Sequence, residues 1–185
     1  LASGFYNMDC MDGMAQFPDK FFELAIVDPP YGLGSKLYTG GSISPFIKSQ
    51  AKQIKAWDVE PTETYFKELQ RVSVNQIIWG GNHFSRHLQS FRCFIFWDKT
   101  IHGNTYADGE LAWTSFDMPA RCYRENIAFI TIEGRIHPTQ KSIALYKWLL
   151  TNYAHPGDKI LDTHVGSASS LIACHQLGFQ YWGFE

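Results

Sequence analysis

The sequence has few cysteines, no long apolar run and no excess of positive charge, and each absence excludes a class of protein. The four cysteines form no Cys-x-x-Cys pair, so we expect reduced thiols and neither a zinc site nor a disulfide framework. No apolar run approaches the roughly 20 residues of a membrane helix, which predicts a cytoplasmic protein without a membrane partner. With a net charge of -2, any nucleic-acid partner would need a local basic patch.

The 185 residues are enough for one domain with a sizeable core, and we treat 1–185 as a single domain. Apolar runs of strand length alternate with segments of helical periodicity. This alternation predicts an α/β fold with a mostly parallel central sheet and helices on both faces. The expected strands are Phe5–Met8, Leu24–Val27, Gln76–Trp79, Phe91–Trp97, Ile127–Ile132, Lys159–Leu161 and Phe179–Phe184. The expected helices are Met11–Phe17, Thr62–Val72, Ser142–Tyr153 and Ser167–Leu177.

The segment from Lys159 to the end of the chain has the pattern of a nucleoside site. A strand ends near Asp162, a turn passes through Gly166, a helix follows, and a second strand precedes Glu185. Glu185 follows Gly166 by 19 positions, close to the roughly 20-residue spacing at which a carboxylate meets a ribose hydroxyl. The loop THVGSASS has one glycine, whereas a dinucleotide loop typically has three to approach the pyrophosphate. This disfavours a nicotinamide-dependent oxidoreductase and favours S-adenosylmethionine, which has no phosphate and carries a positive sulfonium.

The stretch ELAIVDPPYGLG, residues 23–34, contains more than a simple turn needs. A buried strand ends on a carboxylate, which is followed by two prolines and an aromatic ring. Pro29 and Pro30 have fixed φ and no N–H, so the chain leaves the sheet stiffly and the Pro29 carbonyl is free to accept a hydrogen bond. Asp28 supplies a second acceptor, and Tyr31 supplies a ring face. Two acceptors beside a ring predict a receptor for an exocyclic amine on a planar base.

Such a receptor explains how a poor nucleophile could be methylated. The lone pair of an adenine amine is delocalised into the ring, and two acceptors that draw its hydrogens out of the plane stabilise the charge that develops during attack. A sulfonium methyl held in line could then transfer directly. Carbon-5 methylation of cytosine commonly uses a cysteine after a proline, and this chain has no Pro-Cys pair.

Three motifs together resemble those of the S-adenosylmethionine-dependent DNA amino-methyltransferases of the adenine-N6 type. They are DPPY at 28–31, HPTQK at 137–141 and LDTHVGSAS at 161–169. The catalytic motif precedes the cofactor motif, which is the order of the permuted β group. The resemblance therefore implies a Rossmann-like methyltransferase fold with circularly permuted motif order, S-adenosylmethionine as cofactor and double-stranded DNA as partner.

The resemblance also implies roles for individual residues. In the catalytic motif Asp28, Pro29, Pro30 and Tyr31, the first two would bind the amine and Tyr31 would stack on the base. Lys141 would lie near the carboxylate of the cofactor, and Glu185 near its ribose. The implied cofactor-binding set is Asp9, Cys10, Asp28, His137, Thr139, Lys141, Asp162, Thr163, His164, Val165, Gly166, Ser167 and Glu185.

Contact with DNA is predicted for the glycine-containing loop 32–57. No acidic residue lies between Asp28 and Asp58, so we expect a mobile, locally positive loop that contacts phosphates. The target base would have to flip out of the duplex to reach the pocket. We expect segment 117–137 to be a short recognition or connecting region. The lysines assigned to DNA binding are Lys36, Lys48, Lys52 and Lys55.

Several alternatives stay open at this point. Cytosine N4 presents a similar amine, although serine is more usual in place of Asp28 in such enzymes, and a catalytically inactive DNA-binding relative is a further alternative. Val165 and Ala168 stand where phenylalanine and a second glycine are common in the family. His83 and His87 are four residues apart, but no third ligand is evident, so no metal site is predicted. A homodimer and a cognate restriction enzyme remain open as partners.

Overall fold

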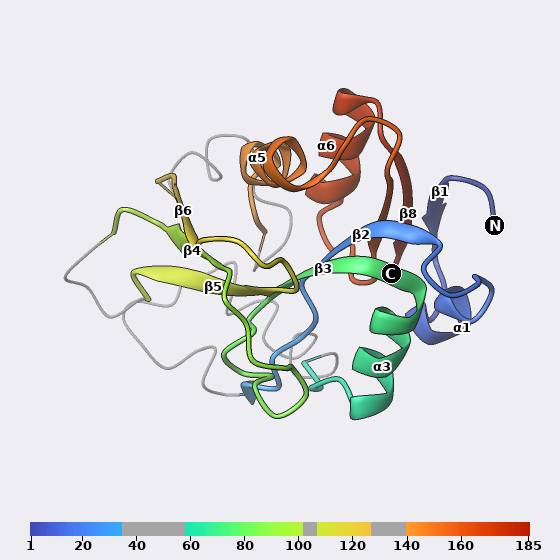
Figure 1. The fold of residues 1–185 in the computed structure, drawn as a ribbon, viewed down its shortest axis with the longest axis horizontal. Coiled ribbons are helices and arrows are strands. Elements are labelled where there is room, and N and C mark those ends of the chain that lie inside the picture. Colours follow the sequence, from blue (N-terminus) through green and yellow to red (C-terminus); the bar gives the residue numbers. More distant parts are fainter. Residues whose placement is uncertain (35–57, 102–106, 127–139) are drawn as a thin grey trace.

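A twisted eight-stranded sheet runs through the part of the chain that the computed structural model describes, residues 1–34, 58–101, 107–126 and 140–185 (Figure 1). Helices lie on both sides of this sheet. The strands are β1 (Gly4–Tyr6), β2 (Phe22–Val27), β3 (Ser73–Trp79), β4 (Phe94–Asp98), β5 (Gly109–Thr114), β6 (Arg121–Arg124), β7 (Lys159–Asp162) and β8 (Gln180–Phe184). The helices are α1 (Cys10–Met14), α3 (Glu63–Val72), α5 (Ile143–Tyr153) and α6 (Ser169–Leu177).

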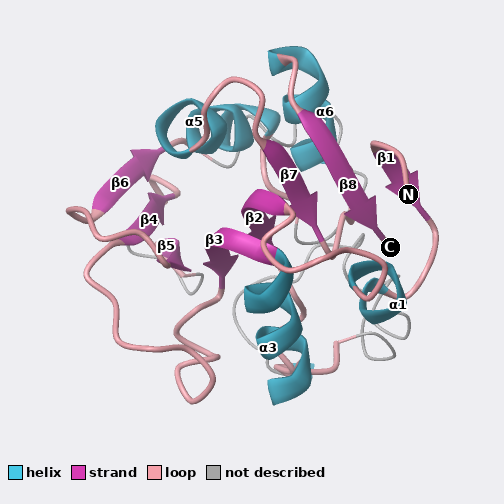
Figure 2. Cartoon of the chain, turned by 45° about the vertical axis from the view of Figure 1, so that its right-hand side comes forward, coloured by secondary structure: helices cyan, strands magenta, loops and turns pink. Residues whose placement is uncertain are grey.

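The strand order is β1-β8-β7-β2-β3-β5-β4-β6, and most neighbours are parallel (Figure 2). The exceptions are the β3–β5 and β5–β4 pairs, which are antiparallel. β2 and β7 are adjacent although they are far apart in the sequence, with Leu24 opposite Ile160 and Ala25 opposite Leu161. The chain runs outward from this pair in both directions, so the ends of β2 and β7 form the switch point where ligands of open α/β sheets bind.

The apolar run of β2 faces both ways because alternate residues of a strand point to opposite faces. Leu24 and Ile26 pack in a core with residues of α5 and α6. Ala25 and Val27 pack in a second core with residues of α1 and α3. Both faces of the central strand are therefore covered, as the uninterrupted run predicted.

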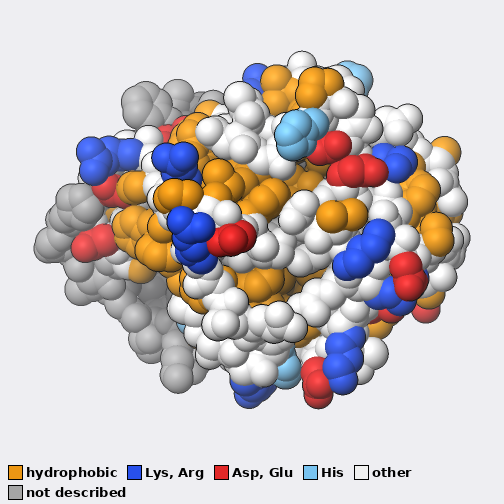
Figure 3. Space-filling model, in the orientation of Figure 1, with side chains coloured by type: hydrophobic (Ala, Val, Ile, Leu, Met, Phe, Trp, Pro, Cys, Tyr) orange, Lys and Arg blue, Asp and Glu red, His pale blue; other side chains and the backbone are white. Residues whose placement is uncertain are grey.

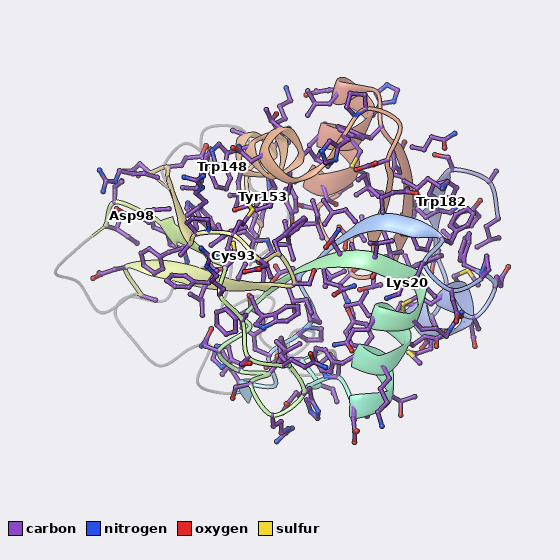
Figure 4. All side chains as sticks on the ribbon, in the orientation of Figure 1. Lys20, Cys93, Asp98, Trp148, Tyr153 and Trp182 are labelled. Atoms are coloured by element: carbon purple, nitrogen blue, oxygen red, sulfur yellow. The ribbon has the colours of Figure 1, made fainter. Side chains whose placement is uncertain are left out.

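Helix α5 shows how the sequence pattern sets an element's bounds. Ser142 is its N-cap, and the Ser142 hydroxyl accepts a hydrogen bond from the Leu145 amide at 3.0 Å, which satisfies one of the free donors at the helix start. Trp148 and Tyr153 of α5 lie over Cys93 in the first core (Figure 4). No helix in the described segments is both long and apolar enough to cross a membrane.

The predicted mostly parallel α/β fold is confirmed, with two strands that the sequence reading missed. No strand was predicted over β5, and β6 lies inside the segment 117–137, at the edge of the sheet that the described strands form. The helix predicted over Ser167–Leu177 begins at Ser169, after Ala168 as N-cap. Thr62 is the N-cap of α3 as predicted, but its side chain makes no capping hydrogen bond. The strand predicted over Ile127–Ile132 lies outside the described residues.

Candidate active site

The two predicted motifs meet in one pocket beyond the carboxyl ends of β2 and β7. Asp28 directly follows β2, and Asp162 is the last residue of β7. A pocket of about 1080 Å³ opens there and is lined by Asp28, Pro29 and Glu185. Asp28 and Asp162 are more than 130 positions apart in the sequence. The parallel pairing of β2 with β7 brings them to the same edge of the sheet.

The Asp28 carboxylate is held from two directions. The Tyr31 hydroxyl donates a hydrogen bond to Asp28 Oδ1 at 2.8 Å. The Lys141 ammonium donates to Asp28 Oδ2. Burial, together with the neighbouring charge of Asp28, raises the pKa of Tyr31 well above its ordinary value, so the phenol stays protonated and remains a donor. The orientation of the Asp28 carboxylate is thereby fixed.

The Tyr31 ring is in close contact on several sides. A Cβ placed on Gly80 would lie 2.3 Å from Tyr31 Cε1, so only glycine fits at that position. The His83 ring stacks on Tyr31 with 4.9 Å between the centroids and 19° between the planes. His83 also lines the pocket. From the sequence, a metal-ligand role for His83 was weighed and set aside, and its contact with Tyr31 was not predicted.

The backbone conformation after the catalytic motif explains why glycines occur there. Gly32 and Gly34 have φ of +66° and +55°, a region that glycine adopts without cost. Their amides donate to the two oxygens of Asp58, Gly32 at 2.9 Å and Gly34 at 2.6 Å. Asp58 is buried and was not identified from the sequence. It anchors the segment that leaves the active site.

The loop after β7 is held by two carboxylates. Asp162 accepts hydrogen bonds from the His164 amide at 3.0 Å and from the Ser170 hydroxyl. Burial raises the pKa of Asp162 to about 7. Glu185 accepts from the Gly166 amide at 2.8 Å. The two strand ends thus hold the single-glycine loop against the pocket.

A second close approach brings β8 against this loop. A Cβ on Gly183 would lie 2.6 Å from Leu171 Cδ1 and 2.7 Å from Val165 Cγ2. Gly183 therefore lets the start of α6 and the loop pack directly on the last strand. The sequence reading did not single out this glycine.

The structure brings most of the predicted site residues to one pocket. Asp162 lies buried beneath this pocket and does not line it. Asp9 also caps α1, because its carboxylate accepts from the Met11 amide at 2.7 Å. His137, Thr139 and the four predicted DNA-binding lysines lie outside the described residues. The lining residues from the predicted set are Asp9, Cys10, Asp28, Pro29, Pro30, Tyr31, Lys141, Thr163, His164, Val165, Gly166, Ser167 and Glu185.

The residues of the pocket suit a cationic nucleoside better than a dinucleotide. The carboxylates of Asp28 and Glu185 line it, whereas its loop offers a single glycine and no set of amides for a pyrophosphate. Burial lowers the pKa of His164 to about 4, so this imidazole stays neutral at physiological pH and adds no charge. Burial also raises the pKa of the Cys10 thiol to about 11, which excludes it as a thiolate nucleophile near neutral pH.

Comparisons with known proteins agree with this architecture. Residues 93–185 match the family model described as N6/N4 DNA methylase. The proposed methylase YubD of Escherichia coli (strain K12) is 23% identical over 205 residues, which cover 99% of this chain and 84% of that protein.

Solved structures show the same fold at low sequence identity. The complex of M1.HpyAVI with S-adenosylmethionine has a TM-score of 0.62 at 17% identity, covering 98% of this chain and 92% of that one. The proposed DNA modification methylase TTHA0409 of Thermus thermophilus has a TM-score of 0.59 at 16% identity, with 99% and 88% covered. The cytosine-N4-specific PvuII DNA methyltransferase has a TM-score of 0.65 at 12% identity, with 100% and 82% covered. The central sheet is therefore that of the class I methyltransferase fold.

Proposed function

The chain belongs to the N6/N4 DNA methylase family, and on this premise we propose that it transfers a methyl group from S-adenosylmethionine to the N6 amine of an adenine flipped out of duplex DNA. The observation that carries the proposal is the single pocket that joins Asp28 and Pro29 to the loop Thr163–Ser167 and Glu185. An amine bound by Asp28 and Pro29 would face a cofactor held by the loop and Glu185. No covalent enzyme intermediate is needed.

The residues of this chain have distinct parts in the reaction. Bound S-adenosylmethionine would supply an electrophilic methyl group. Asp28, which Tyr31 and Lys141 orient in the free protein, and the Pro29 carbonyl accept hydrogen bonds from the two amine hydrogens and stabilise the positive charge that develops on nitrogen. Glu185 receives the ribose hydroxyls, and the loop through Gly166 encloses the cofactor. Among these, Asp28 and Pro29 are the residues that contact the reacting amine.

Adenine rather than cytosine is proposed because aspartate opens the Asp-Pro-Pro-Tyr motif. The PvuII enzyme shows that the same fold also serves a cytosine-N4-specific enzyme, so the fold does not choose the base. The test is to methylate unmodified DNA with the protein, digest it to nucleosides and identify the product by mass spectrometry. We expect N6-methyladenine. N4-methylcytosine would overturn the choice of base, and no methylated nucleoside would overturn the proposed function.

The DNA contact predicted for the four lysines of segment 32–57 stays a prediction, because they lie outside the described residues. On the face of the molecule shown in Figure 3, lysine and arginine side chains are interspersed with acidic ones. Among the described residues, Arg92 pairs with Asp117 at 3.1 Å, and Arg86 pairs with Glu60 at 2.6 Å. This distribution agrees with the net charge of -2.

Binding of S-adenosylmethionine is expected to depend on pH through Asp162. Because burial raises the pKa of Asp162 to about 7, this carboxyl is largely neutral below pH 7 in the free protein. A cationic cofactor favours its ionised form, so binding must release the proton, and affinity rises with pH up to the pKa and then levels off. Between pH 5.5 and 7 we expect the Kd to fall several-fold, with a limit of about tenfold per pH unit.

Isothermal titration calorimetry in two buffers of different ionisation enthalpy measures both the affinity and the released proton. The Asp162→Asn variant has no carboxyl to titrate and should lose this pH dependence. A Kd that is constant from pH 5.5 to 7 in the wild-type protein would contradict the coupling between Asp162 and the cofactor.

A further inference from the structure

Lys141 lies between two carboxylates in the wall of the pocket. Its side chain is only 2% exposed. The ammonium donates to Asp28 Oδ2 and lies 3.1 Å from Glu110 Oε2. It also lies 5.1 Å from the centroid of the Trp79 ring, which offers a weaker cation–π contact. A buried ammonium is costly unless its charge is paired, and this one has two carboxylates within reach.

The contacts of Lys141 with the two carboxylates are unequal. Asp28 Oδ2 accepts a hydrogen bond from the ammonium, whereas Glu110 Oε2 is the more distant of the two oxygens and forms an ion pair with it at 3.1 Å. Glu110 Oε2 is buried and has no hydrogen-bond partner within the described segments. The nearby ammonium compensates the charge of this oxygen, but no donor in the described segments is aligned with it. Glu110 therefore presents a spare acceptor to an ammonium that is engaged elsewhere.

Glu110 is itself fixed in place and charged. Its other oxygen pairs with Lys99 at 2.6 Å, and Lys99 lies 5.2 Å from the centroid of the Trp97 ring. Although burial opposes ionisation, the charges of Lys141 and Lys99 lower the pKa of Glu110 to about 2. Four charged side chains thus form a row in which positive and negative charges alternate and the net charge is zero. They are, in order, Lys99, Glu110, Lys141 and Asp28.

Reaction at Asp28 would disturb this arrangement. Asp28 already accepts from Tyr31 and from Lys141, and an incoming amine would add a further donor that shares the carboxylate oxygens with them. If Lys141 turns away from Asp28, its buried charge requires another acceptor. Glu110 Oε2, at 3.1 Å, can accept the hydrogen bond after a small rotation of the ammonium.

We propose that Glu110 is a positioning residue that takes up the Lys141 ammonium when Asp28 accepts the target amine. This role rests on the proposed function of the site. Glu110 does not contact the substrate in this role, and it acts on Asp28 only through Lys141. Because the exchange occurs as the amine is activated, its loss should slow the methyl-transfer step more than it weakens the binding of cofactor or DNA.

The test is the isosteric variant Glu110→Gln. We expect kcat, measured by transfer of radiolabelled methyl groups to DNA, to fall about 10- to 100-fold, which corresponds to the loss of one charge-assisted hydrogen bond. The KM for DNA and the Kd for S-adenosylmethionine should stay within about threefold of wild type. Glu110→Asp keeps the charge on a shorter side chain and should recover part of kcat. Glu63→Gln removes one carboxylate from the exposed ion pair with Lys67 and is the matched control, with activity unchanged.

Three outcomes would overturn this role. Wild-type kcat in Glu110→Gln would show that Lys141 does not need the second carboxylate. A loss confined to KM, Kd or the thermal midpoint, with Glu110→Asp no better than Glu110→Gln, would indicate a purely structural part. A wild-type protein that binds S-adenosylmethionine without methylating DNA would refute the proposed function, and with it this role of Glu110.

Discussion

Replacement of Asp28 by alanine is expected to reduce methyl transfer by at least about 10²- to 10³-fold, the usual effect of removing a group that stabilises charge in the transition state. Asp28 is the carboxylate of the pocket that both Tyr31 and Lys141 orient, at 2.8 Å in the case of Tyr31. Without it the Pro29 carbonyl is the single acceptor left for the amine. Lys141 keeps Glu110 as a partner, so the pocket retains its other charges.

Single-turnover transfer of labelled methyl groups to DNA measures this loss, and calorimetry measures the cofactor separately. The Kd for S-adenosylmethionine should change less than about tenfold, because most of the predicted cofactor contacts come from other residues of the pocket, chiefly the loop after β7 and Glu185. Asp19→Ala is the control, since Asp19 is 77% exposed and pairs with Arg71 away from the pocket. Full activity in Asp28→Ala would refute the assignment of Asp28.

The two ends of the site could be predicted from the sequence because each follows a buried strand. The run Leu24–Val27 has no polar residue, which indicates a strand covered on both faces, and a carboxylate directly after it must lie at the sheet edge. The same reasoning places Asp162 at the end of β7. Parallel strands bring their carboxyl ends to one edge, so proximity in space follows from the pattern without any knowledge of contacts.

The supports of Asp28 could not be predicted in the same way. Lys141 is 113 positions from Asp28, and its motif suggested the carboxylate of the cofactor as its partner. Asp58 holds Gly32 and Gly34 across a segment that was read only as a loop. Such pairs depend on side-chain packing between distant elements, and no periodicity in the sequence encodes them.

Strands β5 and β6 were missed for a related reason. β5 begins with Gly109 and Glu110, residues that are uncommon in strands, and its buried half is only three residues long. β6 has arginine at both ends, and among the described strands it pairs with β4 alone. Both strands exist because neighbouring strands offer them hydrogen bonds, and tertiary pairing overrides their weak local preference.

The departure at Ala168 has a visible structural consequence. Ala168 has φ of +61°, a left-handed conformation that glycine adopts more readily than alanine. Glycine would adopt this backbone conformation at the start of α6 without strain. The chain tolerates alanine because the turn between Val165 and Ala168 closes with a backbone hydrogen bond at 3.0 Å.

Gly80→Ala is expected to impair the site severely even though Gly80 has no side chain to contribute. Its φ is +70°, and an added Cβ would lie 2.3 Å from Tyr31 Cε1. The left-handed conformation alone should cost about 1–2 kcal/mol in free energy of unfolding. The clash should cost a further 1–3 kcal/mol or displace the Tyr31 ring. Displacement would break the hydrogen bond that orients Asp28, and a misplacement of about 1 Å can lower a rate about 10²-fold.

Gly157→Ala is the control that separates the cost of the left-handed backbone from the cost of the clash with Tyr31. Gly157 has φ of +94°, but no atom lies within 4 Å of an added Cβ. Both variants should show a lower free energy of unfolding in urea, and only Gly80→Ala should lose activity under conditions where both are folded. Equal activity in the two folded variants would mean that the Tyr31 ring can move without disturbing Asp28. Such a result would separate the orientation of the carboxylate from the packing of the ring, and Lys141 would then be the residue that fixes Asp28.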